Sequence, residues 1–187
     1  MQRDIERVLI PQEQIARRVA ELARMITVDH SAPRLAGPAE ITIVPVFTGA
    51  MIFCGDLIRQ VPLHMQIGLM SVSSYPGRSL SAQDAAVVAP QLGDLKGRHV
   101  LLIDDVLDSG QTIKLVQAVV REQGAASVRT CVLLRKDRPS ARQVAVDYVG
   151  FDIPDVFVVG YGLDFDNYYR NLPDIVSLKA RVIEGRT

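Results

Sequence analysis

The sequence is poor in the residues that mark metal, redox and disulfide-rich proteins, with two cysteines and three histidines in 187 residues. Cys54 and Cys131 each lie in an apolar stretch, without a second cysteine at CxxC spacing and without a nearby histidine. We therefore expect two buried, reduced thiols and no metal or redox site at these positions. The histidines show no spacing that pairs them with a partner, and we assign them no functional role.

Long apolar runs are also absent, since none approaches the roughly 18 residues that a membrane-spanning helix requires. The N-terminal segment MQRDIERVLI mixes charges of both signs with isolated apolar residues, unlike a secretion signal. These observations predict a cytoplasmic protein with no membrane partner.

An excess of charge of one sign is missing as well, because lysine and arginine together number 21 and so do aspartate and glutamate. Without an overall field the chain cannot hold nucleic acid by charge alone, so we expect no nucleic-acid partner and only local binding of anions. Its 187 residues, without an internal repeat, predict a single domain over residues 1–187 that buries roughly two thirds of its unfolded surface.

Apolar periodicity predicts helices and strands that alternate along the chain. The first helix begins after Pro11, and its apolar residues recur at helical spacing: Ile15, Val19, Leu22 and Ile26. Further helices are expected over residues 49–61 and 112–124, and strands over residues 41–47, 63–75, 97–103, 127–136, 155–160 and 174–178. Loops are expected over residues 30–38 and 76–90, and residues 75–86 are expected to be mobile and to close over a bound ligand. This order predicts an α/β fold with a mostly parallel, twisted sheet and helices on both faces.

The segment VLLIDDVLDSGQT, residues 100–112, carries two acids at the end of an apolar strand, then a third acid, a Ser-Gly pair and a threonine. In open α/β sheets, ligands bind at the carboxyl ends of strands, where the next helix offers unpaired N–H groups and the positive end of its dipole. The segment DSGQT can therefore surround a phosphate with its amides, and the hydroxyls of Ser109 and Thr112 add donors. Gly110 permits close approach of the backbone. The GxxxxGK[ST] spacing of a Walker loop is absent.

The three acids need a role of their own, because carboxylates beside a phosphate repel it. Asp104 and Asp105 could accept hydrogen bonds from a ribose diol or lie near Mg²⁺. Asp108 faces the phosphate site and is placed to accept a proton. Any one of them could equally be a solvated loop acid or a helix cap, but the ordered set favours a binding site.

This segment closely resembles the phosphoribosyl pyrophosphate signature of type I phosphoribosyltransferases: a hydrophobic strand, two acids, two aliphatic residues, a further acid and [ST]-G-x-T. The resemblance implies the fold of that family, with a small hood formed by the terminal segments and a purine-binding part at about 150–187. It also implies that Asp104 and Asp105 bind phosphoribosyl pyrophosphate together with Ser109, Gly110, Gln111 and Thr112.

Three other segments, residues 73–75, 133–139 and 149–175, are similar to the hypoxanthine-guanine branch of that family, so that the resemblance runs from about residue 8 to about residue 178. It implies transfer of the 5-phosphoribosyl group from phosphoribosyl pyrophosphate to N9 of hypoxanthine or guanine. The products are IMP or GMP and pyrophosphate, and the reaction belongs to purine salvage. Asp108 would take or share the proton at purine N7, and a homodimer or homotetramer is expected because active sites of the family typically lie near a subunit interface.

The same resemblance assigns the remaining ligand contacts. The purine would be bound by Lys136, Phe157, Val158 and Asp164; pyrophosphate by Thr48, Gly49 and Arg170; and Mg²⁺ by Asp104, Asp105 and Asp164.

One position departs from the family pattern. The pyrophosphate loop usually carries a basic residue before its glycine, and in VFTGA this slot holds Thr48, so one cationic contact is missing. The family often has a non-proline cis peptide in this loop, which would fall at Phe47–Thr48.

Three other functions stay open at the level of sequence. The first is a xanthine-preferring enzyme, because the contacts to purine position 2 are largely backbone contacts. The second is a non-catalytic, nucleotide-sensing regulator of the same fold, although such proteins often lose the acid at the position of Asp108. The third is a phosphoacceptor receiver domain, which also ends a strand in paired acids but has no use for DSGQT.

Overall fold

The computed structural model describes residues 1–31, 40–74 and 85–185. At its centre is a sheet with the strand order β5 (Ala85–Gln91), β4 (Leu69–Ser74), β2 (Glu40–Phe47), β6 (His99–Leu107), β7 (Ser127–Lys136) and β8 (Tyr148–Ile153), and β3 (His64–Ile67) also pairs with β2. Neighbouring strands are parallel, except that β5 runs antiparallel to β4. The predicted α/β fold with a mostly parallel sheet is confirmed.

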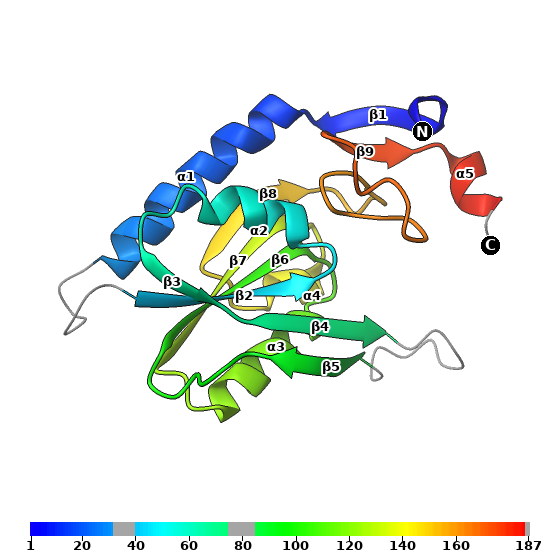
Figure 1. Ribbon diagram of the computed structural model, residues 1–187. Coiled ribbons are helices and arrows are strands. Elements are labelled where there is room, and N and C mark those ends of the chain that lie inside the picture. The colour runs from blue at the N-terminus through cyan, green and yellow to red at the C-terminus, as the bar shows by residue number, and fades with distance from the viewer. Residues whose placement is uncertain (32–39, 75–84, 186–187) are drawn as a thin grey trace.

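Helices cover both faces of this sheet, which explains why its central strands are apolar on both sides (Figure 1). Leu101 and Ile103 of β6 pack in the same cluster as α1 (Gln12–His30) and α2 (Met51–Ile58). The alternate residues, Val100 and Leu102, pack against α3 (Gln111–Glu122) on the opposite face, where α4 (Pro139–Arg142) also lies.

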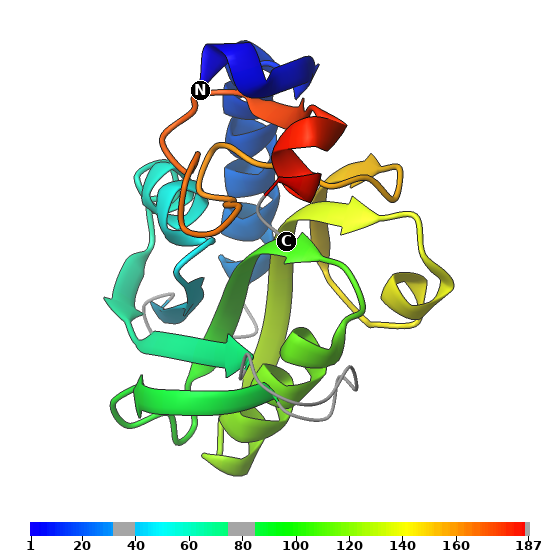
Figure 2. The same cartoon turned by 90° about the vertical axis from the view of Figure 1, so that its right-hand side faces the viewer.

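The two ends of the chain form a second, smaller sheet beside the first. It pairs β1 (Ile5–Ile10) with β9 (Ile175–Leu178) in antiparallel register, flanked by the short helices η1 (Gln2–Asp4) and α5 (Ala180–Glu184). Figures 1 and 2 show the loop that precedes β9, drawn in orange, between this small sheet and the edge of the central one. Its side chains pack with β9 in a separate apolar cluster: Val159, Tyr169 and Leu172 with Val176 and Leu178. The expected hood of terminal segments is therefore present in the fold.

Several predicted elements differ from the observed ones. The strand expected over residues 63–75 is divided into β3 and β4 at Gly68, whose N–H donates to the carbonyl of Ile43 while a Cβ there would crowd the backbone of Leu92. The loop expected over residues 76–90 contains β5, and its first part, residues 75–84, lies outside the described residues. β6 continues through both acids to Leu107, four residues beyond the predicted end at Ile103, because β7 pairs with it that far.

The strand predicted over residues 155–160 does not form. Its apolar residues leave the central sheet after Pro154, and Val159 instead makes an isolated antiparallel bridge with Val176 of β9. β1 and β8 were not predicted, because their apolar residues are interrupted by charged and small ones.

Both cysteines are buried free thiols, as predicted. Burial raises the pKa of Cys54 to about 11, so this thiol is not reactive at neutral pH. In the three described ranges, no helix is both long enough and apolar enough to span a membrane.

Candidate active site

The carboxyl ends of β2, β6 and β7 meet at one edge of the sheet, because these strands are parallel neighbours. The chain leaves β2 at Phe47, β6 at Leu107 and β7 at Lys136. The residues predicted for the site follow directly: Thr48 and Gly49 after β2, residues 108–112 after β6, and Lys136 at the end of β7. The topology thus gathers three distant sequence segments at one place.

Asp104 and Asp105 are adjacent residues of β6 close to this edge. Asp104 is 5% exposed, and its carboxylate accepts the N–H of Asp105 at 3.1 Å. Burial raises the pKa of Asp104 well above its usual value, and the neighbouring charge of Asp105 adds to the effect. Burial also raises the pKa of Asp105, while hydrogen bonds and the charge of Arg170 act in the opposite direction. A cation or a hydroxyl donor placed here would favour the charged form of both acids.

The turn after β2 approaches these acids closely. The Phe47–Thr48 peptide is cis, as the family resemblance suggested. A Cβ on Gly49 would overlap the carboxylate of Asp105, so any other residue at this position would have to displace that carboxylate. Thr48 is exposed. Both predicted pyrophosphate residues of the turn therefore lie at the strand edge, next to the acids.

The DSGQT segment makes the turn from β6 into α3. Gly110 is the N-cap of α3. Two features favour glycine at this position: its φ of 82° lies in the left-handed region, and a Cβ there would overlap the side chain of Val144. Ser109 and Gln111 are exposed, and Thr112 is half-buried in the first turn. The first N–H groups of a helix have no partner within that helix, so this turn can bind a phosphate with backbone donors.

Asp108 belongs to a cluster of four charges at the mouth of this turn. Its carboxylate lies 3.0 Å from Lys136 Nζ and 2.6 Å from Arg138 Nη1. Asp155 closes the cluster at 3.5 Å from Lys136 Nζ and 2.7 Å from Arg138 Nε. The structure thus brings together the predicted base Asp108 and the predicted purine residue Lys136.

Arg138 and Asp155 were not predicted as site residues. Both lie inside the segments LLRKDRP and IPD that carried the resemblance, but a charge that follows a strand is usually a solvated one. Only the parallel pairing of β7 with β8 places them opposite each other.

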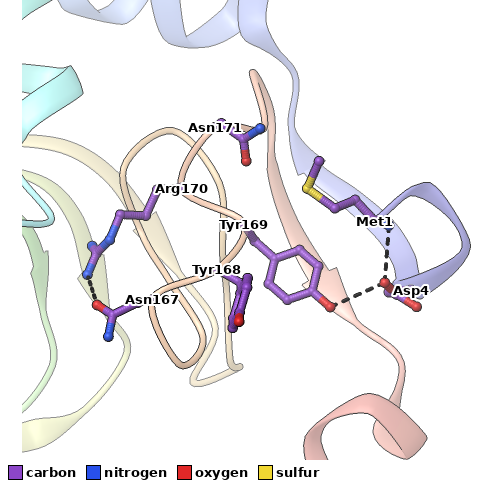
Figure 3. A pocket seen from close by; sticks show the side chains of 7 residues that line it. All are labelled: Met1, Asp4, Asn167, Tyr168, Tyr169, Arg170 and Asn171. Atoms are coloured by element: carbon purple, nitrogen blue, oxygen red, sulfur yellow. Dashed lines mark hydrogen bonds and ion pairs between the residues drawn. The ribbon is translucent and has the colours of Figure 1, made fainter.

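A second group of predicted residues gathers around Arg170. Its guanidinium lies 2.9 Å from Asp164 and donates to the carbonyl of Gly162 at 2.8 Å. It also donates to Asn167 at 3.3 Å, and Figure 3 shows it turned toward Asn167 and away from Tyr169, whose hydroxyl points to Asp4. A Cβ on Gly162 would overlap the carbonyl of Gly49, so this loop rests directly on the turn after β2. Arg170, Asp164, Gly49 and Asp105 are therefore neighbours.

Phe157 offers an exposed aromatic face. It is 42% exposed, although an aromatic residue within DVFVVG would ordinarily be in the core. Its ring makes an edge-to-face contact with Phe165, with ring centroids 5.5 Å apart and planes at 80°. Val158, the next residue, is buried, so it can offer a ligand only its backbone.

The residues present fit Mg²⁺ if the substrate completes its coordination. Asp104 and Asp105 supply hard oxygen ligands. Within the part of the chain that the structure describes, no third His, Cys, Asp or Glu joins them in a metal-binding cluster, so Asp164, the third ligand that the resemblance implied, does not complete the set. Mg²⁺ in proteins usually takes one or two carboxylates and keeps water or substrate phosphate oxygens in its other positions.

Comparisons with known proteins agree with this geometry. The sequence profile of the phosphoribosyl transferase domain matches residues 10–166. A hypoxanthine-guanine phosphoribosyltransferase of Mycobacterium avium is 41% identical over 182 residues, covering 97% of this chain and 89% of that protein. A protein of the same name from Bacillus subtilis is 37% identical over 189 aligned positions, covering 99% of each chain.

The fold comparison points the same way. A solved structure of a hypoxanthine phosphoribosyl transferase of Trypanosoma cruzi superposes with a TM-score of 0.87 at 31% identity, over 98% of this chain and 96% of that one.

Proposed function

The chain belongs to the phosphoribosyl transferase family, and we propose that it transfers the 5-phosphoribosyl group from phosphoribosyl pyrophosphate to N9 of hypoxanthine or guanine. The products are IMP or GMP and pyrophosphate, so that the enzyme serves purine salvage in the cytoplasm. Relatives over nearly the whole chain carry the name of this activity.

The observation that carries the choice of substrate is the 3.0 Å pair of Lys136 Nζ and Asp108. In a 6-oxopurine, the exocyclic oxygen O6 and the ring nitrogen N7 lie side by side on one edge of the base. A donor next to an acceptor matches that edge, with Lys136 on O6 and Asp108 on the proton at N7. Adenine has an amino group in place of O6 and would present a donor to the lysine. The pair therefore favours 6-oxopurines over 6-aminopurines.

The purine would lie between this pair and the C-terminal part of the chain, about residues 150–187. Phe157 offers its exposed face for stacking, and the backbone of Val158 would form hydrogen bonds at the edge of the base. Asp164, which is ion-paired to Arg170, would complete the purine contacts. Xanthine differs from guanine only at position 2, where the contacts to the base would come from backbone groups. The assay below must therefore include xanthine.

The phosphoribosyl part would bind to β6 and the turn that follows. Residues 109–112 would hold the 5-phosphate with backbone N–H groups at the start of α3, and Asp104 and Asp105 would accept hydrogen bonds from the ribose hydroxyls. Thr48 and Gly49 would bind pyrophosphate with their amides, and Arg170 would neutralise part of its charge. Mg²⁺, held by Asp104 and Asp105 together with the substrate, would neutralise more of the negative charge on the leaving group.

Asp108 would act on the proton of the base. As the bond from ribose to pyrophosphate breaks, positive charge develops on the ribose ring, and N9 of the purine forms the new bond. The base must lose its proton from the opposite side of the five-membered ring, where Asp108 accepts it. Lys136 and Arg138 hold the carboxylate in place for that transfer.

Purified protein should be incubated with phosphoribosyl pyrophosphate, Mg²⁺ and each of hypoxanthine, guanine, xanthine, adenine and orotate, while nucleotide formation is followed. We expect turnover with hypoxanthine and guanine and little or none with adenine and orotate. Turnover with xanthine alone would point to the xanthine-preferring branch, and binding of nucleotide without turnover of any base would point to a regulator.

We further propose that the protein is a homodimer or homotetramer. Apolar side chains are exposed along α2 and the neighbouring strands, with Met51 at 47%, Ile67 at 52% and Leu69 at 41%. A second subunit would cover them. Light scattering at micromolar concentration should give at least twice the mass of one chain, and a monomer would remove this proposal.

A further inference from the structure

A hydrogen bond joins the loop that carries Arg170 to the helix that follows the pyrophosphate turn. The hydroxyl of Tyr161 donates to Asp56 Oδ2 at 2.7 Å, and Tyr161 is only 7% exposed. Burial and this bond raise the pKa of Tyr161, so the hydroxyl keeps its proton at neutral pH and remains a donor. Neither residue belongs to the site described above.

The loop needs such a fixing point, because its backbone is in a conformation that L-residues rarely adopt. In the described ranges, the non-glycine residues with positive φ all fall between residues 161 and 169: Tyr161 at 51°, Asp166 at 53°, Asn167 at 63° and Tyr169 at 72°. Such conformations persist only where surrounding contacts determine them. This stretch also contains Asp164 and ends next to Arg170.

The backbone of Tyr161 is central to that arrangement. Its N–H donates to the carbonyl of Leu172 at 2.8 Å, and the next N–H, that of Gly162, donates to the carbonyl of Arg170 at 2.9 Å. Gly162 packs so closely on the carbonyl of Gly49 that a Cβ would overlap it, and its own carbonyl holds the Arg170 guanidinium. A shift of Tyr161 would therefore move Arg170 relative to Gly49.

The other end of the bond is fixed to the opposite side of the same site. Asp56 lies in α2, and α2 begins right after the Thr48–Gly49 turn, where the N–H of Met51 donates to the carbonyl of Thr48 at 3.2 Å. A cavity of about 240 Å³, lined partly by Ile52, Asp56, Tyr161 and Leu172, adjoins the bond and leaves the loop room to move if the bond is lost.

We propose that Tyr161 and Asp56 are positioning residues for the leaving group: their hydrogen bond holds Arg170 at a fixed separation from the Thr48–Gly49 turn. The inference rests on the proposed function, because it assigns a role to the two parts of a pyrophosphate site. Neither side chain touches substrate. Their effect falls mainly on Arg170 at the phosphoribosyl pyrophosphate end of the site. Of the residues proposed for the purine, only Asp164 lies in the same loop, whereas Lys136 and Asp108 depend on β6 and β7.

The kinetic test compares Tyr161→Phe with a matched variant, Tyr148→Phe. Tyr148 is also buried, and its hydroxyl also donates to an aspartate, Asp29, at 2.8 Å, but it lies on β8 against α1 and away from the site. Loss of one hydrogen bond corresponds to about threefold to tenfold in binding. We expect Tyr161→Phe to raise the KM for phosphoribosyl pyrophosphate by about that factor, with the KM for hypoxanthine little changed, and Tyr148→Phe to change neither.

Asp56 provides a second pair of variants. Asp56→Ala removes the acceptor and should raise the same KM, whereas Asp56→Asn keeps an acceptor oxygen and should restore most of the wild-type value. The double variant Tyr161→Phe, Asp56→Ala should be no worse than the more affected single variant, because both remove one bond. Equal KM values for Tyr161→Phe and wild type, or a rise in both KM values shared by Tyr148→Phe, would overturn the inference.

Hydrogen exchange separates this inference from the proposed function, because it needs no turnover. In Tyr161→Phe the amides of Tyr161 and Gly162 should exchange faster than in wild type, while the amide of Asp147, bonded to Thr130, should not change. A wild-type protein inactive toward every base would refute the function and leave this result standing. Unchanged exchange at Tyr161 and Gly162 would refute the positioning role in an active enzyme.

Discussion

At the scale of single residues, the three aspartates of residues 104–108 lie in two different environments. Burial raises the pKa of Asp104 and of Asp105, whereas Asp108 lies outside the strand between Lys136 and Arg138. The spacing of the acids in the sequence predicted that they form a set. The ion pairs of Asp108 with two cations were not predictable, because they depend on how β6 and β7 pair.

Thr48 occupies the position where the family resemblance leads us to expect a basic residue, and it sets the first prediction. Thr48→Lys would place a cation beside the Gly49 turn and should lower the KM for pyrophosphate in the reverse reaction by about tenfold, the scale of one charge-assisted hydrogen bond. Thr48→Gln, which is long but neutral, is the control and should change the value much less. The same KM for Lys and Gln would show that charge at this position does not reach the leaving group.

At the scale of elements, the turn between β2 and α2 depends on a missing side chain. Gly49→Ala would force a Cβ into the Asp105 carboxylate, so we expect kcat/KM for phosphoribosyl pyrophosphate to fall by more than about tenfold, or 1.4 kcal/mol.

Gly55→Ala is the matched control within α2, where a Cβ would meet nothing within 4 Å. It should leave activity unchanged and raise the free energy of unfolding by up to about 1 kcal/mol, because alanine is the better helix former. Kinetics and urea unfolding of both variants decide between these outcomes, and equal activity of the two would contradict the close packing of the turn.

Elements with a strong local pattern were predicted, and elements defined by distant partners were not. The apolar period of α1 and the continuous apolar runs of β2, β6 and β7 are local features of the sequence. β1 has only one buried residue, Ile10, and exists because β9, more than 160 residues later, pairs with it. The strand expected over residues 155–160 does not form, because its local apolar pattern is used elsewhere: Val159 pairs with Val176 of the small terminal sheet, and Phe157 stays exposed. Site residues that follow strand ends were predictable, but the fixing contacts of the loop around Gly162 were not.

At the scale of the whole molecule, stability should depend on pH through His30. This side chain is 5% exposed at the end of α1, with Nδ1 2.8 Å from the carbonyl of Ile26. Burial lowers the pKa of His30, and the nearby charge of Arg129 acts in the same direction, while the hydrogen bond and Asp29 oppose it. The unfolded chain therefore binds a proton at higher pH than the folded one, so the free energy of unfolding should fall as pH drops below about 6.5.

His30→Asn isolates this contribution, because Asn can still donate to the Ile26 carbonyl but does not titrate. Asp104 and Asp105 shift stability in the opposite direction, since burial raises their pKa and protonation then favours the folded state. The informative quantity is thus the difference in free energy of unfolding between wild type and His30→Asn, measured by urea at pH 7.5 and 5.5. The free energy of unfolding of wild type, relative to that of the variant, should be lower at pH 5.5 than at pH 7.5. A difference that is the same at both pH values would contradict the assignment.

The role of Asp108 distinguishes a catalyst from a protein that merely binds phosphoribosyl pyrophosphate. Asp108→Asn preserves size but removes the basic oxygen next to Lys136. Asp155→Asn is the control, because it also removes a carboxylate from the pair of Lys136 and Arg138 without touching the proposed proton acceptor. Asp105→Asn is the contrast within β6, since the loss of a charge-assisted hydrogen bond to ribose weakens the ground state and should appear largely in KM.

The most direct measurement is therefore kcat of Asp108→Asn with hypoxanthine and with guanine, alongside the affinity of the same variant for phosphoribosyl pyrophosphate with Mg²⁺ by calorimetry. We predict that affinity stays within about threefold of wild type while kcat falls by ~10²–10⁴, the usual scale for loss of a general acid or base. Asp155→Asn should lower kcat by less than tenfold, the interval of about 1.4 kcal/mol. A near-normal kcat in Asp108→Asn with both bases would contradict proton transfer to this carboxylate and leave it as one more ionic partner of Lys136.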